Sequence, residues 1–289
     1  MCLLELADNR SLSLDRPRIM GILNVTPDSF SDGGRWADAD RAVEHGIEMC
    51  REGADVIDVG GASTRPGAER VDASEQKRRV VGVIRRLRRR LDREFPDVAI
   101  SVDTTRVEVA AAALEVGAAI LNDVSAGCDD PGMFGLAAQH PAPIVLMHMQ
   151  GTPATMQQSP RYDEVVAEIV NFLGERVGAA VAAGAARSQI LIDPGIGFGK
   201  TTEHNLGILA HLDRFVATGH PVLLGTSRKR FMGSICQEAD ERQPAPADLV
   251  GATCATTALG VAAGVAMFRV HDVRANRQAV DVARAIALA

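Results

Sequence analysis

The chain has 289 residues, of which 46% are hydrophobic and 24% are charged, and its formal net charge at pH 7 is −6. This balance is typical of a globular protein with a sizeable core. The acidic charge argues against nucleic acid as a partner, since phosphate binding depends on an excess of Lys and Arg. No apolar run is long enough to span a membrane, so no membrane partner is expected either.

Cysteine usage and the N-terminal residues indicate a cellular compartment. The five cysteines are scattered and form no C-x-x-C pair, which favours free thiols over disulfides or a zinc site. The first ten residues, MCLLELADNR, carry Glu5 and Asp8 and no basic segment, unlike a signal peptide. We therefore expect a cytoplasmic protein.

Short runs rich in Ile, Val, Leu and Ala recur along the chain, with helix-like stretches between them. Nearly continuous apolar runs are typical of strands buried on both faces of a parallel sheet. The runs are RIMGILN (18–24), ADVIDVG (54–60), VAISVD (98–103), AAILND (118–123), PIVLMH (143–148), QILIDP (189–194), PVLLGT (221–226) and VAMFRV (265–270). Eight strands, each followed by a helix, predict an α/β fold, a single-domain (β/α)8 TIM barrel over residues 18–289, preceded by an N-terminal extension over residues 1–17.

The run RRLRRRLDR (85–93) is the one strongly basic segment. Leu87 and Leu91 lie four residues apart within it, a spacing that predicts an amphipathic helix with a solvated charged face. The alternative is a site for a polyanion.

Polar side chains and glycines stand where the predicted strands end. In a (β/α)8 barrel these carboxyl ends and the loops after them carry the chemistry, so we expect the residues to converge on a ligand. They are Asn24, Gly60, Gly61, Asp103, Asn122, Asp123, His148, Asp193, Gly225, Ser227, Lys229, Arg269 and His271.

The segment DPGIGFGKT (193–201) resembles a nucleotide-binding loop but does not satisfy either standard pattern. Pro194 stands where the phosphate loop needs glycine, and Lys200 where the dinucleotide fingerprint needs glycine. One interpretation is a flexible loop. The other is that Asp193 points into the barrel mouth, while the glycines let Phe198 approach a flat ligand.

The remaining polar tips allow two interpretations each. Asp103 and Asn122 are suited to hydrogen-bond a heterocycle, or to cap helices, and for Asp123 we favour capping. Ser227 with Lys229, at a predicted helix start, and Arg269 with His271, after the last strand, are suited to an anion. His148 is interpreted as a residue behind the site, and the sequence has no pattern of a protein-only metal site.

Taken together, eight ordered segments resemble the dihydropteroate synthase family of folate biosynthesis, which sulfonamides target. They are GILNVTPDSFSDGG, DVGGASTRPGA, SVDTTR, LNDVSAG, VLMHMQGTP, DPGIGFGK, GTSRKRF and RVHDV. The resemblance runs from Arg18 to Val273. It implies a transferase that condenses 6-hydroxymethyl-7,8-dihydropterin pyrophosphate with 4-aminobenzoate, giving 7,8-dihydropteroate and pyrophosphate.

The resemblance also implies residue roles. Asp193 would accept two pterin donors, with Asp103, Asn122 and Lys229 at the other ring edges and Met147 and Phe198 on its faces. The turn with Gly225 and Ser227 would line the same site. Pyrophosphate would lie against Asn24, Thr64, Arg65, Arg269 and His271, with Mg²⁺ held by Asn24. Asp28, Phe30 and Ser31 would act in the first loop, and the family suggests a homodimer.

Two residues depart from the family pattern. Ala62 replaces the Glu of G-G-E-S-T-R, and Arg230 replaces the last Ser of S-R-K-S, which meets the aminobenzoate carboxylate. Three alternative functions stay open: a pterin-binding methyltransferase, a non-catalytic pterin-binding paralogue, and an aldolase that uses Lys229 as a Schiff base. The Arg65 loop and the Arg269–His271 pair favour a pyrophosphate substrate over the methyltransferase.

Overall fold

Eight parallel strands form a ring in the computed structural model, which describes residues 3–25, 34–62, 71–237 and 242–289. Neighbours follow the order β8-β7-β6-β5-β4-β3-β10-β9, and the bridge between Ile192 and Val222 joins the two ends of that series. The strands are β3 (Arg18–Asn24), β4 (Val56–Gly60), β5 (Ala99–Asp103), β6 (Ile120–Asp123), β7 (Ile144–Met147), β8 (Ile190–Asp193), β9 (Leu223–Leu224) and β10 (Met267–Val270). The predicted (β/α)8 barrel is confirmed.

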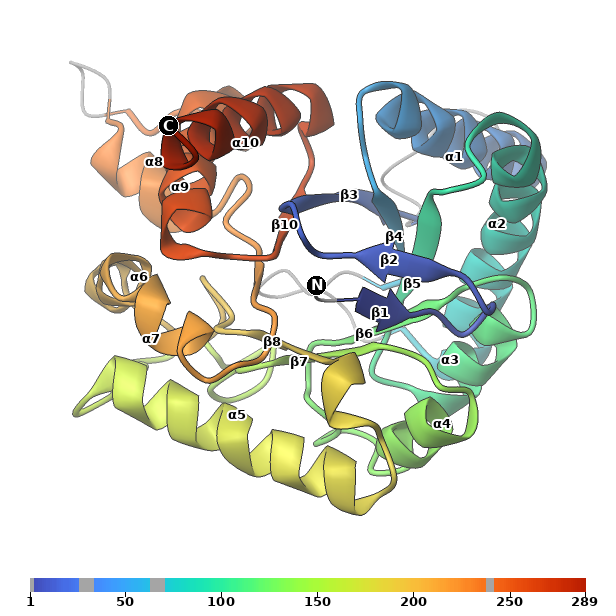
Figure 1. Cartoon of the computed structure of the whole chain (residues 1–289), viewed down its shortest axis with the longest axis horizontal. Coiled ribbons are helices and arrows are strands. Elements are labelled where there is room, and N and C mark those ends of the chain that lie inside the picture. Colours follow the sequence, from blue (N-terminus) through green and yellow to red (C-terminus); the bar gives the residue numbers. More distant parts are fainter. Residues whose placement is uncertain (1–2, 26–33, 63–70, 238–241) are drawn as a thin grey trace.

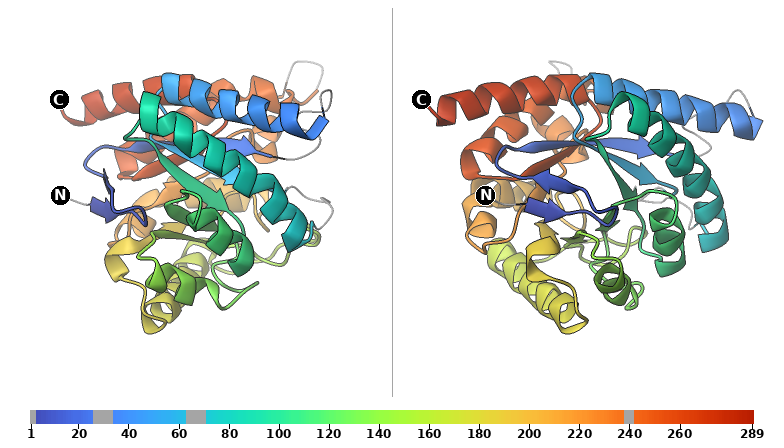
Figure 2. Two further views of the ribbon diagram at one scale, coloured as in Figure 1. Left: turned by 90° about the vertical axis from the view of Figure 1, so that its right-hand side faces the viewer. Right: turned by 45° about the vertical axis from the view of Figure 1, so that its right-hand side comes forward.

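Helices surround this ring (Figures 1 and 2). Each parallel crossover returns over the outside of the sheet, as the handedness of such connections requires. The helices are α1 (Gly34–Arg51), α2 (Ala73–Glu94), α3 (Val107–Leu114), α4 (Met133–Gln139), α5 (Val165–Ala182), α6 (Thr202–Ala210), α7 (Leu212–Val216), α8 (Arg230–Ile235), α9 (Val250–Ala263) and α10 (Val273–Ala287), with short 3₁₀ turns at Arg187–Gln189 and Pro246–Asp248.

Most predicted strands are one or two residues longer than the observed ones. The largest difference is at residues 221–226, where only Leu223–Leu224 are paired as a strand. Pro221 has no backbone N–H to give to a ladder, and Val222 makes an isolated bridge with Ile192.

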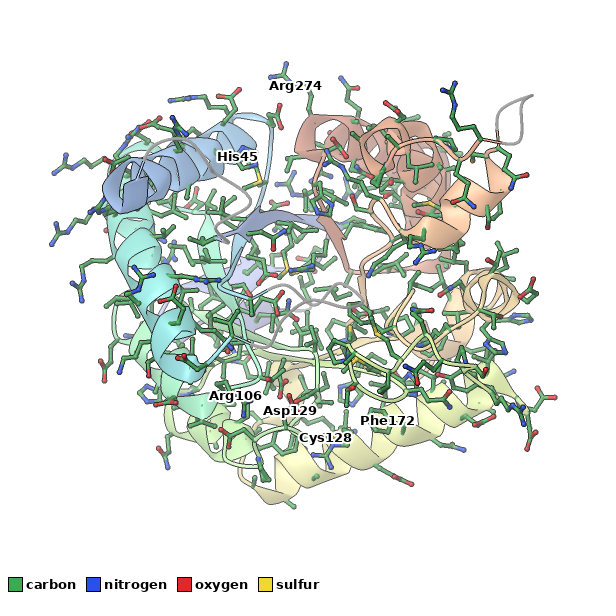
Figure 3. All side chains as sticks on the ribbon, turned by 180° about the vertical axis from the view of Figure 1, so that it is seen from behind. His45, Arg106, Cys128, Asp129, Phe172 and Arg274 are labelled. Carbon is green, nitrogen blue, oxygen red and sulfur yellow. The ribbon has the colours of Figure 1, made fainter. Side chains whose placement is uncertain are left out.

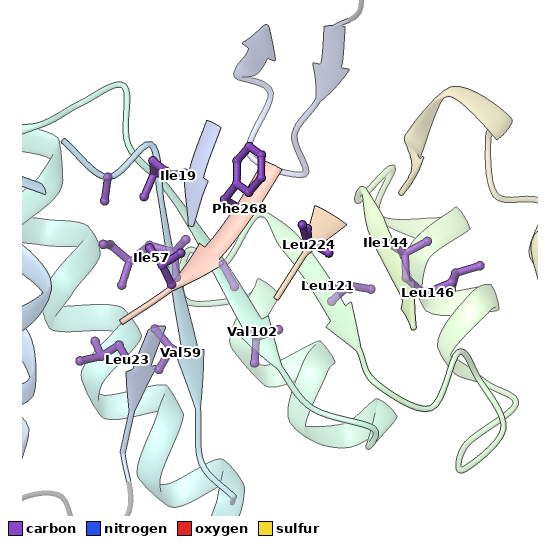
Figure 4. Packing of buried hydrophobic residues seen from close by; sticks show 14 of the residues in the cluster. Ile19, Leu23, Ile57, Val59, Val102, Leu121, Ile144, Leu146, Leu224 and Phe268 are labelled. Atoms are coloured by element: carbon purple, nitrogen blue, oxygen red, sulfur yellow. The ribbon is translucent and has the colours of Figure 1, made fainter. Parts of the chain in front are cut away.

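Side chains along each strand alternate between the outside and the inside of the barrel. Outward residues such as Ile57, Val59 and Phe268 pack under the helices in one large core (Figure 4). Inward residues near the amino ends form a second apolar cluster, which contains Met20, Val56 and Met267 and their neighbours on the other strands. The barrel interior is therefore a packed apolar layer at this level.

A two-stranded hairpin covers the amino end of the barrel. Strands β1 (Leu3–Glu5) and β2 (Ser11–Ser13) pair antiparallel, and Figure 1 shows them across the ring opening. Leu4, Leu6 and Leu12 are buried in the same cluster as the inward side chains of the strands. The hairpin thus closes the apolar layer from below.

We expect Leu4→Ala to lower the free energy of unfolding by about 2–5 kcal/mol, because it removes a buried side chain and leaves a cavity. Leu4 is fully buried, whereas its neighbour Leu3 is 38% exposed. Urea denaturation of both alanine variants would check this. Equal losses for Leu3→Ala and Leu4→Ala would contradict the role of the hairpin as a cover.

The basic run at residues 85–93 lies in α2, and its apolar face is buried as predicted. Leu87 and Leu91 are both fully buried. On the outer side, Arg90 contacts Glu44 and Glu94, and Arg86 contacts Asp40. These ion pairs, two with α1 and one within α2, support the solvated-face interpretation of the run.

Two further observations concern the expected location. Among the described residues, no helix is long and apolar enough to cross a membrane. Cys50, Cys128, Cys236 and Cys254 are free thiols, as the scattered cysteines predicted.

Candidate active site

One layer above the apolar interior, the inward positions of most strands change to polar residues or glycine. Because side chains alternate, the inward residue after Val56 on β4 is Asp58, and the one after Leu191 on β8 is Asp193. The corresponding positions on β6, β7 and β10 hold Asn122, Met147 and Arg269. The period of two therefore brings residues from five strands to one level of the barrel, at its carboxyl end.

Arg269 and Asp58 form the centre of this layer. The guanidinium donates from Nε to Asp58 Oδ2 and from Nη2 to Asp103 Oδ2, each at 2.7 Å. Asn122 Nδ2 donates to the same Asp58 oxygen at 3.0 Å. Asp58 is fully buried, so it acts as the fixed counter-charge that orients Arg269 and Asn122.

Asn24 lies beside this network. A methyl group at Gly60 would lie 3.6 Å from both Asn24 Oδ1 and Asp103 Oδ2. The absence of a side chain at Gly60 thus leaves an open position between these two oxygens.

Burial perturbs the carboxyl groups of the mouth. Desolvation raises the pKa of Asp103 to about 7, against the opposing effect of the Arg269 charge. It also raises the pKa of Asp193 to about 6, although the Gly195 N–H hydrogen bond lowers it. Burial and the charge of Arg269 lower the pKa of Lys229 to about 8. Groups that titrate near neutrality and face one another mark a functional site.

The loop after β8 is firmly held rather than flexible. Gly195 N donates to Asp193 Oδ1 at 2.7 Å, and Gly197 N donates to Asn205 Oδ1 at 2.7 Å. The loop carbonyls accept from side chains of the neighbouring loop: Gly197 from Gln157 at 2.8 Å, and Gly199 from Tyr162 at 2.9 Å. The flexible-loop interpretation of this segment is therefore wrong.

Two glycines let this loop approach the end of β7 backbone to backbone. Gly195 and Gly199 have φ angles of 69° and 63°, a region that favours glycine. A methyl group would lie 1.9 Å from His148 O at Gly195 and 2.4 Å from Gln150 O at Gly199. Any larger residue would push the two loops apart.

An apolar wall borders the mouth on this side. Phe198, Met147, Val124 and Met156 form a buried cluster of their own. Lys229 Nζ lies 3.9 Å from the centre of the Phe198 ring, within the range of a cation–π interaction. The wall and the amine together form one side of a slot suited to a planar, polar-edged ligand.

Ser227 and His271 meet on the other side. Ser227 Oγ accepts from His271 N at 3.1 Å and lies 3.0 Å from His271 Nδ1. The next residues, Arg228 and Asp272, form a two-point ion pair at 2.7 and 3.1 Å. The β9 and β10 loops are thereby fixed to each other.

The base of the loop after β4 is anchored by α2. Arg79 donates to Gly61 O at 3.0 Å, and Gln76 donates to Val71 O at 2.9 Å. These contacts hold the chain on both sides of the segment that departs from the family at Ala62. Thr64, Arg65, Asp28, Phe30 and Ser31, which the sequence placed in the two loops, lie outside the described residues.

A cavity of about 420 Å³ lies on the rim of the same face. Figure 3 shows this face and labels Arg106 and Asp129, from the loops after β5 and β6. Two of the carboxylates that line it serve the backbone, because Asp72 caps α2 and Asp130 accepts from Val107 N. The lining residues are Val71, Asp72, Ala73, Arg106, Glu108 and Asp130.

Asp123 and His148 lie behind the site. Asp123 does satisfy local backbone groups, as we favoured, but it accepts from Ser125 and Gly127 in a turn rather than at a helix start. His148 is buried behind the mouth, where its ring meets Phe172 edge-on at 4.9 Å. Burial lowers the pKa of His148 to about 3, so the ring is neutral.

Sequence reasoning missed Asp58 and Lys200. Asp58 stands inside an apolar run predicted to be buried on both faces. A carboxylate at a buried strand position could have indicated a functional residue. Lys200 was noted only as a mismatch to a nucleotide pattern. It is 3% exposed and contacts His148 and Phe198.

The sequence and the fold of this chain match a known family. Residues 20–271 match the family of pterin-binding enzymes. The chain belongs to the pterin-binding enzyme family. A relative named dihydropteroate synthase, from Synechocystis, is 44% identical over 271 residues, which cover 94% of this chain and 90% of that protein.

Members of the pterin-binding family with solved structures share the whole fold. Dihydropteroate synthase from Xanthomonas albilineans with 4-aminobenzoic acid is 44% identical, with a TM-score of 0.89 over 100% of this chain and 99% of that one. The same enzyme in complex with 7,8-dihydropteroate is 42% identical, with a TM-score of 0.86 over 99% of each chain. Among pterin-binding enzymes, this chain is thus similar to proteins of one named activity.

Proposed function

We propose that this protein is a dihydropteroate synthase, a transferase of folate biosynthesis and a sulfonamide target. It condenses 6-hydroxymethyl-7,8-dihydropterin pyrophosphate with 4-aminobenzoate and releases pyrophosphate. The observation that carries the proposal is the Asp193 carboxylate, which faces the mouth from β8 beside the Phe198 wall in a chain 44% identical to a dihydropteroate synthase.

Pterin recognition follows from the donors and acceptors of the layer. Gly195 N fixes Asp193 Oδ1 at 2.7 Å, which leaves Oδ2 and the second lone pair of Oδ1 for adjacent ring N–H and amino donors. Asn122 and Asp103 are held by the Asp58–Arg269 network at the other ring edges. Met147 and Phe198 supply apolar contact for the ring, and Lys229 a donor for its acceptor edge.

The diphosphate would bind toward the tips of β3 and β10. Arg269 and His271 provide positive or donor groups there, with Asn24 at the tip of the neighbouring strand β3 and Thr64 and Arg65 from the second loop. Mg²⁺ takes most of its oxygen ligands from phosphate and water, so the single amide oxygen of Asn24 fits an ion carried on the substrate. When bound, the ion would neutralise charge on the leaving group.

Catalysis by these residues consists of placement and charge stabilisation. The C–O bond to the diphosphate breaks, and the electron-rich dihydropterin stabilises the cation that remains. The arylamine nitrogen then attacks that carbon and loses a proton, so no protein nucleophile is needed. Fixed donors and charges that match the transition state commonly contribute two or more orders of magnitude in rate each.

A coupled assay tests the proposal. Purified protein is given the pterin diphosphate, Mg²⁺ and 4-aminobenzoate, and both pyrophosphate and dihydropteroate are measured. We expect pyrophosphate release that depends on the arylamine, yields dihydropteroate and collapses in the Arg65→Ala variant. Tight pterin binding without turnover would overturn the proposal in favour of a non-catalytic binding protein.

We further propose that the protein acts in the cytoplasm as a homodimer. In support, apolar side chains are exposed on the adjacent helices α9 and α10: Leu259 is 62%, Val282 60% and Ile286 71% exposed. Light scattering coupled to size-exclusion chromatography measures the mass directly. A monomer mass at micromolar concentration would contradict this assembly.

A further inference from the structure

Lys200 is a buried cation that the proposed chemistry does not use. It follows the glycine loop of β8, and its side chain folds back under that loop, where the residue is 3% exposed. Among the described residues, its amine has no carboxylate within ion-pair distance. A buried ammonium without a paired anion is costly, so its position calls for a function.

Each N–H of the Lys200 ammonium has an acceptor. Nζ lies 3.0 Å from Phe198 O, 3.0 Å from His148 Nδ1 and 3.4 Å from His148 O. With the His148 ring protonated on Nε2, a neutral amine, which has only two N–H groups, would leave one of these acceptors without a donor. The geometry therefore suits the charged form, and it links the end of β7 to the Phe198 turn.

The same amine acts on Asp193. Burial raises the pKa of the Asp193 carboxyl, and the Gly195 N–H hydrogen bond and the charges of Lys229, Lys200 and Arg269 lower it, in that order. Reciprocally, Asp193 raises the pKa of Lys200, which burial brings down to about 7. Lys200 thus carries its charge in the pH range where Asp193 titrates.

We propose that Lys200 is a positioning residue of the pterin site, which holds the Phe198 turn against the end of β7 and keeps Asp193 ionised. It does this from beneath the loop, without touching the substrate. The inference rests on the proposed function, since it assigns a role in binding the pterin.

Other titratable groups near this position constrain the test. His148, directly after β7, stays neutral, because burial lowers its pKa to about 3. Tyr162 hydrogen-bonds Gly199 O of the same loop, and burial raises its pKa further above its usual value, so the phenol stays neutral. Asp103 also titrates near neutrality, but the charges that act most on it are those of Arg269, Asp58, Asp123 and Lys229. Lys229 titrates near pH 8, on the alkaline side of the range, and the charges that act most on it are those of Arg269, Asp193 and Asp103. A shift of the acid-side midpoint caused by Lys200 should therefore report on Asp193.

The experiment measures binding of 6-hydroxymethylpterin by fluorescence between pH 5 and 8.5. We expect wild-type affinity to fall on the acid side as Asp193 becomes protonated. In Lys200→Met, the pH at which half of the affinity is lost should move up by about half a unit to one unit. Binding of the variant at pH 6 should then be about three- to tenfold weaker than its binding at pH 8.5.

Two further variants separate charge from mechanical support. Lys200→Gln keeps a donor for Phe198 O without the charge, and should show the same shift in midpoint even if Lys200→Met folds poorly. Tyr162→Phe removes the neutral hydrogen bond to Gly199 O of the same loop, and should leave the midpoint in place. Tyr162→Phe therefore serves as the control, because it removes a contact that supports the same loop without carrying a charge.

The outcomes are distinct. Equal weakening at every pH in the Lys200 variants, or an unchanged midpoint, would overturn the inference and leave the proposed function intact. A shift in Tyr162→Phe as large as that in Lys200→Gln would overturn it as well. Wild-type protein that binds no pterin at any pH would instead remove the proposed function, on which the inference rests.

Discussion

Asp193→Asn is expected to lower kcat/KM for the pterin diphosphate by about 10²–10⁴-fold, because a site built to accept from a ligand then presents a donor to it. The asparagine amide has one acceptor oxygen and one NH₂ group, where the carboxylate has two acceptors. One atom must still accept from Gly195 N, so the NH₂ group would face the pterin donors. Steady-state kinetics and direct pterin binding both measure this loss.

Asp123→Asn is the matched control for this substitution. Both aspartates end a strand, on β6 and β8, and both are buried. Asp123 accepts from Ser125 N, Ser125 Oγ and Gly127 N, so we expect Asp123→Asn to cost about 1–3 kcal/mol of stability. The kinetic constants should change little. Comparable losses of kcat/KM in the two variants would contradict the assignment of Asp193 as the pterin acceptor.

The barrel could be predicted because its pattern is local. Runs such as AISVD and ILID are apolar apart from Ser101 and end in a carboxylate. That break repeats once per strand, and in a parallel barrel all such breaks meet at one end. The polar residues at the strand tips were therefore identifiable without knowledge of any contact between them.

The network behind those tips could not be predicted in the same way. Asp58 and Arg269 are 211 residues apart in sequence and meet only because β4 and β10 both border β3. The position of a residue in the sequence does not tell which residue its side chain will contact inside the barrel. Asp58 was consequently treated as part of an apolar strand, although it anchors two of the predicted site residues.

The glycine loop shows a second limit. Gly195, Gly197 and Gly199 are equally compatible with a flexible segment and with a rigid one. Part of the rigidity comes from side chains elsewhere, Tyr162 and Asn205, which hydrogen-bond the loop backbone. Nothing within residues 193–200 encodes those two contacts, so this part of the loop's order emerges only from the folded chain.

Arg269→Met is expected to lower the free energy of unfolding by about 3–5 kcal/mol, because it leaves two buried carboxylates without their shared cation. This change affects Asp58 strongly. Its Oδ2 loses the guanidinium, and its Oδ1 has no hydrogen-bond partner among the described residues. Arg228→Met is the control. Arg228 pairs with Asp272 in a setting where the side chains are 31% and 22% exposed, so its loss should cost about 1 kcal/mol or less.

The pH dependence of that deficit identifies its cause. Without Arg269, the buried carboxyl of Asp103 loses the charge that opposes its desolvation, so its native-state pKa rises further above the unfolded value. The native variant then binds more protons than the unfolded chain, so its stability falls as pH rises through that native pKa. We expect the deficit in urea denaturation to be large at pH 8 and smaller at pH 5.5.

Adding Asp58→Asn to Arg269→Met should restore part of the loss at pH 8, because it removes one uncompensated charge. A deficit that is constant with pH and unaffected by Asp58→Asn would mean that Arg269 stabilises the barrel by packing alone, and that the carboxylates of the mouth do not depend on it for their charge.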